Sequence, residues 1–185
     1  MNKIHLLLLA AFCALVTATP AQDTNSLKTD LGVFETQTGT VLIKGFSQIG
    51  TLTVGTDVVS VYAKESSDIT TGHKADGLAI VISGNAPPRR RILVDCDEID
   101  SLLDSINYLN KISCDVTPLA SFEASYSTKS GFRVVANSLR RQGTIQASLE
   151  YGDDLKILLT TDQMEQFYRL LEQARKNLDA LRSPK

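Results

Sequence analysis

Two amphipathic helix patterns, each following a short apolar run, constrain the fold of this chain more than any other feature. From Ile99 to Leu109 the apolar residues recur at spacings of three and four, and from Met164 to Leu181 they do so again. This spacing places apolar side chains along one side of a helix, which then covers a hydrophobic surface. Both patterns begin with a cap residue that is followed three positions later by Glu or Gln. These pairs are Asp95 with Glu98 and Thr160 with Gln163.

The second half of the chain also contains strands with one apolar and one polar face. Apolar and polar residues alternate from Ser121 to Tyr126 and from Thr144 to Leu149. Antiparallel sheets tolerate a solvated face and parallel sheets rarely do, so the alternation predicts antiparallel pairing. Other short runs rich in Val, Ile, Leu and Thr, separated by turn residues, predict further strands connected by hairpins, with a polar loop from Ser66 to Lys74. These strands are Gly32 to Thr36, Thr40 to Phe46, Thr51 to Val54, Asp57 to Lys64, Leu78 to Ser83, Arg91 to Asp95, Phe132 to Ala136 and Leu155 to Thr160.

The two strand-and-helix units resemble each other when the sequence is shifted by 65 positions, which brings Asp95 onto Thr160. Self-similarity at a fixed offset predicts an internal duplication. The expected fold is α+β, with an antiparallel sheet or sheets and two covering helices, in β-meander-plus-helix halves at residues 31–112 and 113–182. We expect residues 31–182 to form one compact domain. The alternative is two unrelated hairpin sets that each end in a covering helix. A duplicated sheet leaves the face opposite the helices open as a binding surface.

The amino terminus has the pattern of a secretory signal peptide. Lys3 precedes an apolar run from Leu6 to Val16, and small residues follow as far as Ala21. We expect residues 1–21 to be removed, residues 22–30 to be a flexible leader, and the mature chain to lie outside the cytoplasm, in the periplasm or secreted. No later segment is apolar for long enough to span a membrane. The formal net charge of −2 does not suggest a nucleic-acid partner.

Processing would leave two cysteines, Cys96 and Cys114, and a single histidine, His73. Three such residues are too few for the usual zinc sites, and no glycine-rich nucleotide-binding motif is present, so we expect no metal and no cofactor. In an oxidising compartment, a pair of cysteines favours a disulfide. The helix predicted between them, however, displaces the chain by ~20 Å. A Cys96–Cys114 bridge and two separate thiols therefore both remain open.

Two arginine runs stand at predicted turns and are candidate contacts for an anion or an acidic partner. They are Arg89, Arg90 and Arg91, and Arg140 and Arg141. The ordinary interpretation is solubility and protection of the sheet edges from pairing with another chain. The acidic residues between Asp95 and Asp104 suit the amino-terminal end of a helix better than a calcium loop.

The sequence favours a non-enzymatic role over a catalytic one. We expect a secreted or periplasmic binding or assembly module that uses its open sheet face, with an envelope protein as partner. The first alternative is a carrier that holds a small apolar ligand between a sheet and the carboxy-terminal helix. The second is a hydrolase centred on His73, which lies in a polar loop; no Gly-x-Ser-x-Gly turn supplies it with a nucleophile.

Overall fold

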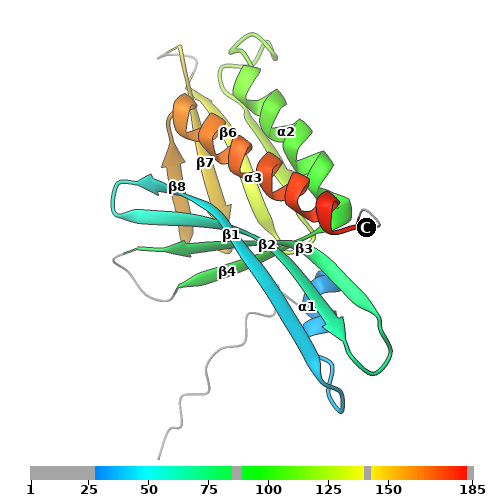
Figure 1. Ribbon diagram of the computed structural model, residues 1–185. Helices are drawn as coiled ribbons and strands as arrows, with labels where there is room; N and C mark the ends of the chain where they lie inside the picture. Colours follow the sequence, from blue (N-terminus) through cyan, green and yellow to red (C-terminus); the bar gives the residue numbers. More distant parts are fainter. Residues whose placement is uncertain (1–27, 85–88, 140–142, 183–185) are drawn as a thin grey trace, which may run out of the picture.

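The computed structural model describes residues 28–84, 89–139 and 143–182, so the predicted signal peptide, leader residues 22–27, Arg140 and Arg141 lie outside the described residues. Two four-stranded antiparallel sheets each run in sequence order, and each is followed by a helix (Figure 1). This arrangement confirms the α+β class with a duplicated meander. The first half has β1 (Leu42–Val54), β2 (Asp57–Asp68), β3 (Lys74–Ser83), β4 (Arg90–Asp95), a 3-10 turn η2 (Cys96–Glu98) and α2 (Ile99–Lys111). The second half has β5 (Glu123–Ser127), β6 (Phe132–Leu139), β7 (Thr144–Tyr151), β8 (Leu155–Leu159) and α3 (Thr161–Arg182).

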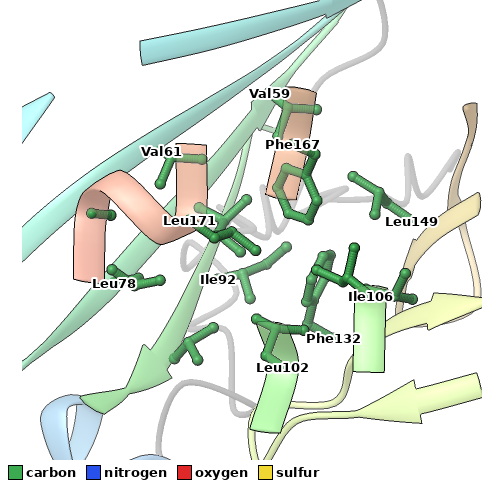
Figure 2. Packing of buried hydrophobic residues seen from close by; sticks show 14 of the residues in the cluster. Val59, Val61, Leu78, Ile92, Leu102, Ile106, Phe132, Leu149, Phe167 and Leu171 are labelled. Carbon is green, nitrogen blue, oxygen red and sulfur yellow. The ribbon is translucent and has the colours of Figure 1, made fainter. Parts of the chain in front are cut away.

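The two halves exchange their helices. Helix α3 packs on β1 and β2 of the first sheet, α2 packs on β5 and β6 of the second, and the two helices contact each other. One hydrophobic core therefore joins both sheets and both helices (Figure 2). At its centre, Phe132 of β6 meets Phe167 of α3 edge to face, with ring centroids 6.2 Å apart. Burial of each such large apolar side chain contributes ~1.5–3 kcal/mol to stability.

The segment predicted as a strand from Gly32 to Thr36 is instead part of a short helix, α1 (Asp30–Glu35), so this prediction was wrong. The Thr29 hydroxyl caps the helix by accepting the N–H of Gly32 at 3.0 Å. The Asp95 carboxylate accepts the N–H groups of Asp30 and Leu31 at 2.8 and 3.0 Å. These side-chain acceptors satisfy the free N–H groups of a helix start. The described end of the segment predicted as a leader includes Thr29, the cap residue, and Asp30, the first residue of α1.

The strands of the first hairpin are longer than predicted. The runs Thr40 to Phe46 and Thr51 to Val54 form one strand, β1, because a bulge between Gln48 and Gly50 absorbs the change of alternation. The predicted loop from Ser66 to Lys74 is also shorter, since β2 continues to Asp68 and β3 starts at Lys74. The polar residues of this segment do not mark an exposed loop throughout, because Ser66 is fully buried in β2 and hydrogen-bonded to Glu35 of α1.

One of the two predicted helix caps is confirmed and the other differs. At α3, the Thr160 hydroxyl accepts the N–H of Gln163 at 3.2 Å, while the Gln163 side chain accepts the N–H of Thr160 at 2.9 Å. At the beginning of α2, the Asp95 side chain makes no cap hydrogen bond to its own helix. The Asp95 carboxylate binds the N–H groups of α1 instead. A short polar side chain can bond either to its own helix or to another backbone segment, and here the contact with α1 is the one formed.

Gly77 of β3 offers a test of how closely the first sheet is packed. A Cβ atom at this position would overlap the backbone carbonyl oxygen of Val94 in β4. We expect Gly77→Ala to lower the free energy of unfolding by about 2 kcal/mol in urea denaturation. Gly45→Ala is the control, because its Cβ would meet the Glu65 carbonyl oxygen at an ordinary 3.7 Å. Equal stability of the two variants would contradict this packing.

Candidate functional site

The two sheets differ in the charge balance of their outer faces, the faces turned away from the core. On the second sheet, Arg133 pairs with Glu123 at 2.6 Å and with Glu150 at 3.2 Å, and Lys156 pairs with Glu150 at 2.8 Å. Neighbouring strands thus present alternating cations and carboxylates. Because these charges compensate one another, the face has the character of an ordinary solvated sheet surface.

The outer face of the first sheet is partly covered by α1. Leu31 is fully buried there against Ala79 and Leu93, with Tyr62 and Ala75 at the margin of the cluster. Figure 1 shows α1 beside the β1–β4 sheet, on the far side from α3. Since α1 is only six residues long, it covers part of the face and leaves the remainder open.

Glu35, the last residue of α1, is surrounded by cations of the sheet. It forms an ion pair with Lys64, and both side chains are nearly inaccessible, with exposed fractions of 4% for Glu35 and 6% for Lys64. The Ser66 hydroxyl donates to its Oε1 at 2.8 Å, and Arg91 donates to its Oε2 at 3.3 Å. Lys44 lies 3.8 Å from Oε2.

Burial raises the pKa of the Glu35 carboxyl, but the hydrogen bonds from Lys64 and Ser66 and the charges of Lys64 and Lys44 outweigh this effect. The net result is a pKa below the usual range. Glu35 is therefore an ionised carboxylate around neutral pH. The surrounding side chains form a built receptor for a carboxylate, and this receptor is filled by a residue of the same chain.

Beside this group, the open part of the face forms a shallow hollow of about 310 Å³, which we call the cationic hollow. Phe46 forms one wall; it is 71% exposed and meets Tyr62 edge to face, with ring centroids 6.4 Å apart. Four cationic side chains surround an apolar floor. Among the described residues, Glu35 is the carboxylate that forms ion pairs with three of them. The residues that line the hollow are Lys44, Phe46, Tyr62, Lys64, Ala79, Val81, Arg89 and Arg91.

The structure brings two of the five predicted arginines to the cationic hollow. Arg89 and Arg91 line it, whereas Arg90 points to the opposite face of β4 and pairs with Asp154 of the β7–β8 turn. Arg140 and Arg141 lie outside the described residues. Alternation within a strand explains the split, because neighbouring side chains point to opposite faces.

Sequence reasoning missed the lysines and aromatic residues of the hollow. Lys44 and Phe46 share a face of β1, and Tyr62 and Lys64 share the same face of β2, where Phe46 stands opposite Lys64. The repeated pairing of an aromatic residue with a lysine two positions away was visible in the sequence. Its meaning depended on the hairpin register, which the unrecognised bulge obscured.

The two cysteines are free thiols at opposite ends of α2. Cys96 is buried where the helix begins, and Cys114 is partly buried after it ends. The thirteen residues of α2 between them span ~20 Å. Of the two open alternatives, the structure contains the separate thiols. Cys114 lines a further hollow of about 590 Å³ between the end of α2, strands β7 and β8, and the start of α3.

His73 and the acidic residues near α2 have mainly structural contacts. His73 is exposed in the β2–β3 turn, where its carbonyl oxygen accepts the N–H of Asp68 at 2.9 Å. Lys129 of the β5–β6 turn binds Asp95 at 3.2 Å and Asp97 at 2.9 Å, and its N–H donates to Glu98 at 2.7 Å. Burial raises the pKa of Glu98. Among the described residues, no three His, Cys, Asp or Glu side chains converge as a metal site requires.

Comparison with known proteins finds no family model that matches the chain and no matching curated protein. Within residues 28–84, 89–139 and 143–182, no helix has both the length and the apolar character needed to cross a membrane.

Loss of the Lys64 ammonium should destabilise the fold strongly. Lys64→Met leaves the buried Glu35 carboxylate without its closest cation, and removal of one partner of a buried pair costs about 3 kcal/mol. The control is Lys156→Met on the second sheet, whose half-exposed ion pair should contribute less than about 1 kcal/mol. Urea unfolding of both variants measures the difference. If Lys156→Met is as damaging as Lys64→Met, the buried pair does not stabilise α1 on the sheet.

The thiols should differ in reactivity. Burial raises the pKa of the Cys96 thiol, and the charge of Asp76 raises it further. Cys96 is therefore slow to react with a thiol reagent, because it is inaccessible and because it is less readily deprotonated. In Ellman titration of the unreduced native protein, we expect Cys114 to react first and Cys96 to react only on unfolding. Cys114→Ser should remove the early phase and leave the late one. A denatured, unreduced sample in which neither thiol reacts would establish a bridge instead.

Proposed function

We propose that this protein is a binding module that works outside the cytoplasm and recognises an anionic group attached to an apolar one. The recognition surface is the cationic hollow on the outer face of the first sheet. The location rests on the signal peptide predicted for residues 1–21. The binding role rests on the composition and the shape of the hollow.

The observation that carries the proposal is an exposed aromatic side chain within a group of cations. Phe46 keeps 71% of its surface in water, although burial of such a ring is worth ~1.5–3 kcal/mol. Around it, Lys44, Arg89 and Arg91 keep partly or largely exposed side chains. A small number of convergent polar groups beside an apolar surface is typical of ligand-binding sites. The volume of the hollow, about 310 Å³, is at the lower end of the usual size of such sites.

The second sheet serves as an internal comparison. It has the same strand order, yet the charges on its outer face are paired within the face. The excess of cations at the cationic hollow is therefore not a requirement of the meander topology. Such an imbalance attracts anions and accelerates their association.

The other two candidate functions receive less support from the geometry. Between α3 and the first sheet, Phe167, Leu171 and Val61 are fully buried against one another, so an apolar ligand there would have to displace core side chains. A hydrolase would need a base, a nucleophile and an orienting acid that converge in a pocket, whereas His73 lies in an exposed turn. We therefore place the ligand on the outer face.

Titration with 1-anilinonaphthalene-8-sulfonate tests the proposal, because this probe joins an anion to aromatic rings. We expect saturable binding that shifts the amide resonances of β1 to β4 around Phe46. The double variant Arg89→Ala/Arg91→Ala should weaken binding about tenfold, the equivalent of ~1.4 kcal/mol, through the loss of two cations. Arg133→Ala, on the outer face of the second sheet, is the matched control and should bind as the unchanged protein does. Binding that is indifferent to Arg89 and Arg91, or that maps elsewhere, would refute the assignment.

A further inference from the structure

Helix α1 shows what kind of segment the outer face of the first sheet binds. Its Leu31 inserts between Ala79 and Leu93, and its Glu35 carboxylate is held by Lys64 and Ser66. Leu31 and Glu35 are four residues apart, so they lie on the same side of the helix, one turn apart. The covered part of the face therefore receives an apolar side chain and a carboxylate from one short helix.

The cationic hollow continues this surface beyond α1. Ala79 and Tyr62 border both the Leu31 cluster and the hollow. Val81 follows Ala79 on the same face of β3, and the β3–β4 register places Arg91 opposite Val81. The uncovered part thus offers an apolar floor beside cations, as the covered part does.

The cations at this floor retain capacity to donate hydrogen bonds. Arg91 gives one hydrogen bond to Glu35 through Nη2, while 53% of its side chain is exposed. A guanidinium has five N–H donors in a planar fork, which matches the two oxygens of a carboxylate. Arg89 is exposed at the same margin. A second carboxylate can therefore bind without displacing Glu35.

We propose that the cationic hollow receives an acidic helical segment of a partner protein, which presents an apolar side chain and a carboxylate one helical turn apart. This inference rests on the proposed function and adds the class of ligand. The small volume suits one or two side chains rather than an acyl chain, and the neighbouring α1 supplies the example of a helix seated on this face.

The test uses three synthetic alanine-based helical peptides with capped ends and the purified protein. The first carries Leu and Glu four residues apart; the second has Gln in place of Glu; the third has the same composition as the first, with Leu and Glu on opposite sides of the helix. Binding is followed by the amide shifts of the protein. We expect the first peptide to shift residues of β1 to β4 around Phe46 and Val81, and the other two to bind about tenfold more weakly.

Protein variants complete the test. Arg89→Ala/Arg91→Ala and, separately, Phe46→Ala should each weaken the first peptide, whereas Arg133→Ala should leave it unchanged. Amide spectra of each variant verify that it is folded. Equal affinity for all three peptides, or binding that maps to the second sheet, would overturn the proposal.

Two further probes separate this proposal from the proposed function. Inorganic phosphate and vesicles of phosphatidylglycerol are titrated in the same way. If the anilinonaphthalene probe binds the hollow, and phosphate or vesicles bind there while the first peptide does not, then the anion site stands and the helical partner is refuted. If none of the probes binds the hollow, both proposals fail.

Discussion

The exchange of helices between the two halves is the constraint on which the rest of the structure depends. Each sheet has one apolar face, and each is covered by the helix that belongs to the other half of the sequence. Both apolar faces and both helix stripes therefore contribute to a single core in which Phe132 and Phe167 meet. With the core faces closed in this way, the outer faces of the two sheets remain accessible for recognition. The two halves differ in what they place on these outer faces and also in the lengths of their strands and helices.

Asp95 connects the core to the candidate binding surface. It lies at the end of β4, is almost fully buried, and accepts N–H groups from α1 and a hydrogen bond from Lys129 of the second half. These contacts hold α1 on the outer face of the first sheet. The position of α1 in turn brings Glu35 to Lys64 and defines where the covered surface ends and the cationic hollow begins. A residue that the sequence presents as a helix cap thus joins three separate segments.

The sequence predicted those parts of the structure that depend on local periodicity. Both amphipathic helices and strands β5 and β7 follow from residue spacing, because their polar and apolar faces match the final environment. The Thr160–Gln163 cap follows from a local sequence motif. Helix α1 could not be predicted in this way, since its start is stabilised by Asp95, which is distant in sequence. Of the residues that line the cationic hollow, the sequence identified only Arg89 and Arg91 as candidate binding residues. Lys44, Phe46, Tyr62 and Lys64 become neighbours through a hairpin register that includes a bulge.

The position of α3 also determines when the protein can complete its fold. Helix α3, which covers the first sheet, is synthesised about a hundred positions after Val59, Val61 and Ile80, so these side chains cannot complete their packing before then. Closing so long a loop carries an entropic cost, and folds dominated by distant contacts form slowly. Until α3 arrives, the first meander exposes an apolar surface. Because the core includes both sheets and both helices, the two halves are expected to complete their folding together rather than one after the other.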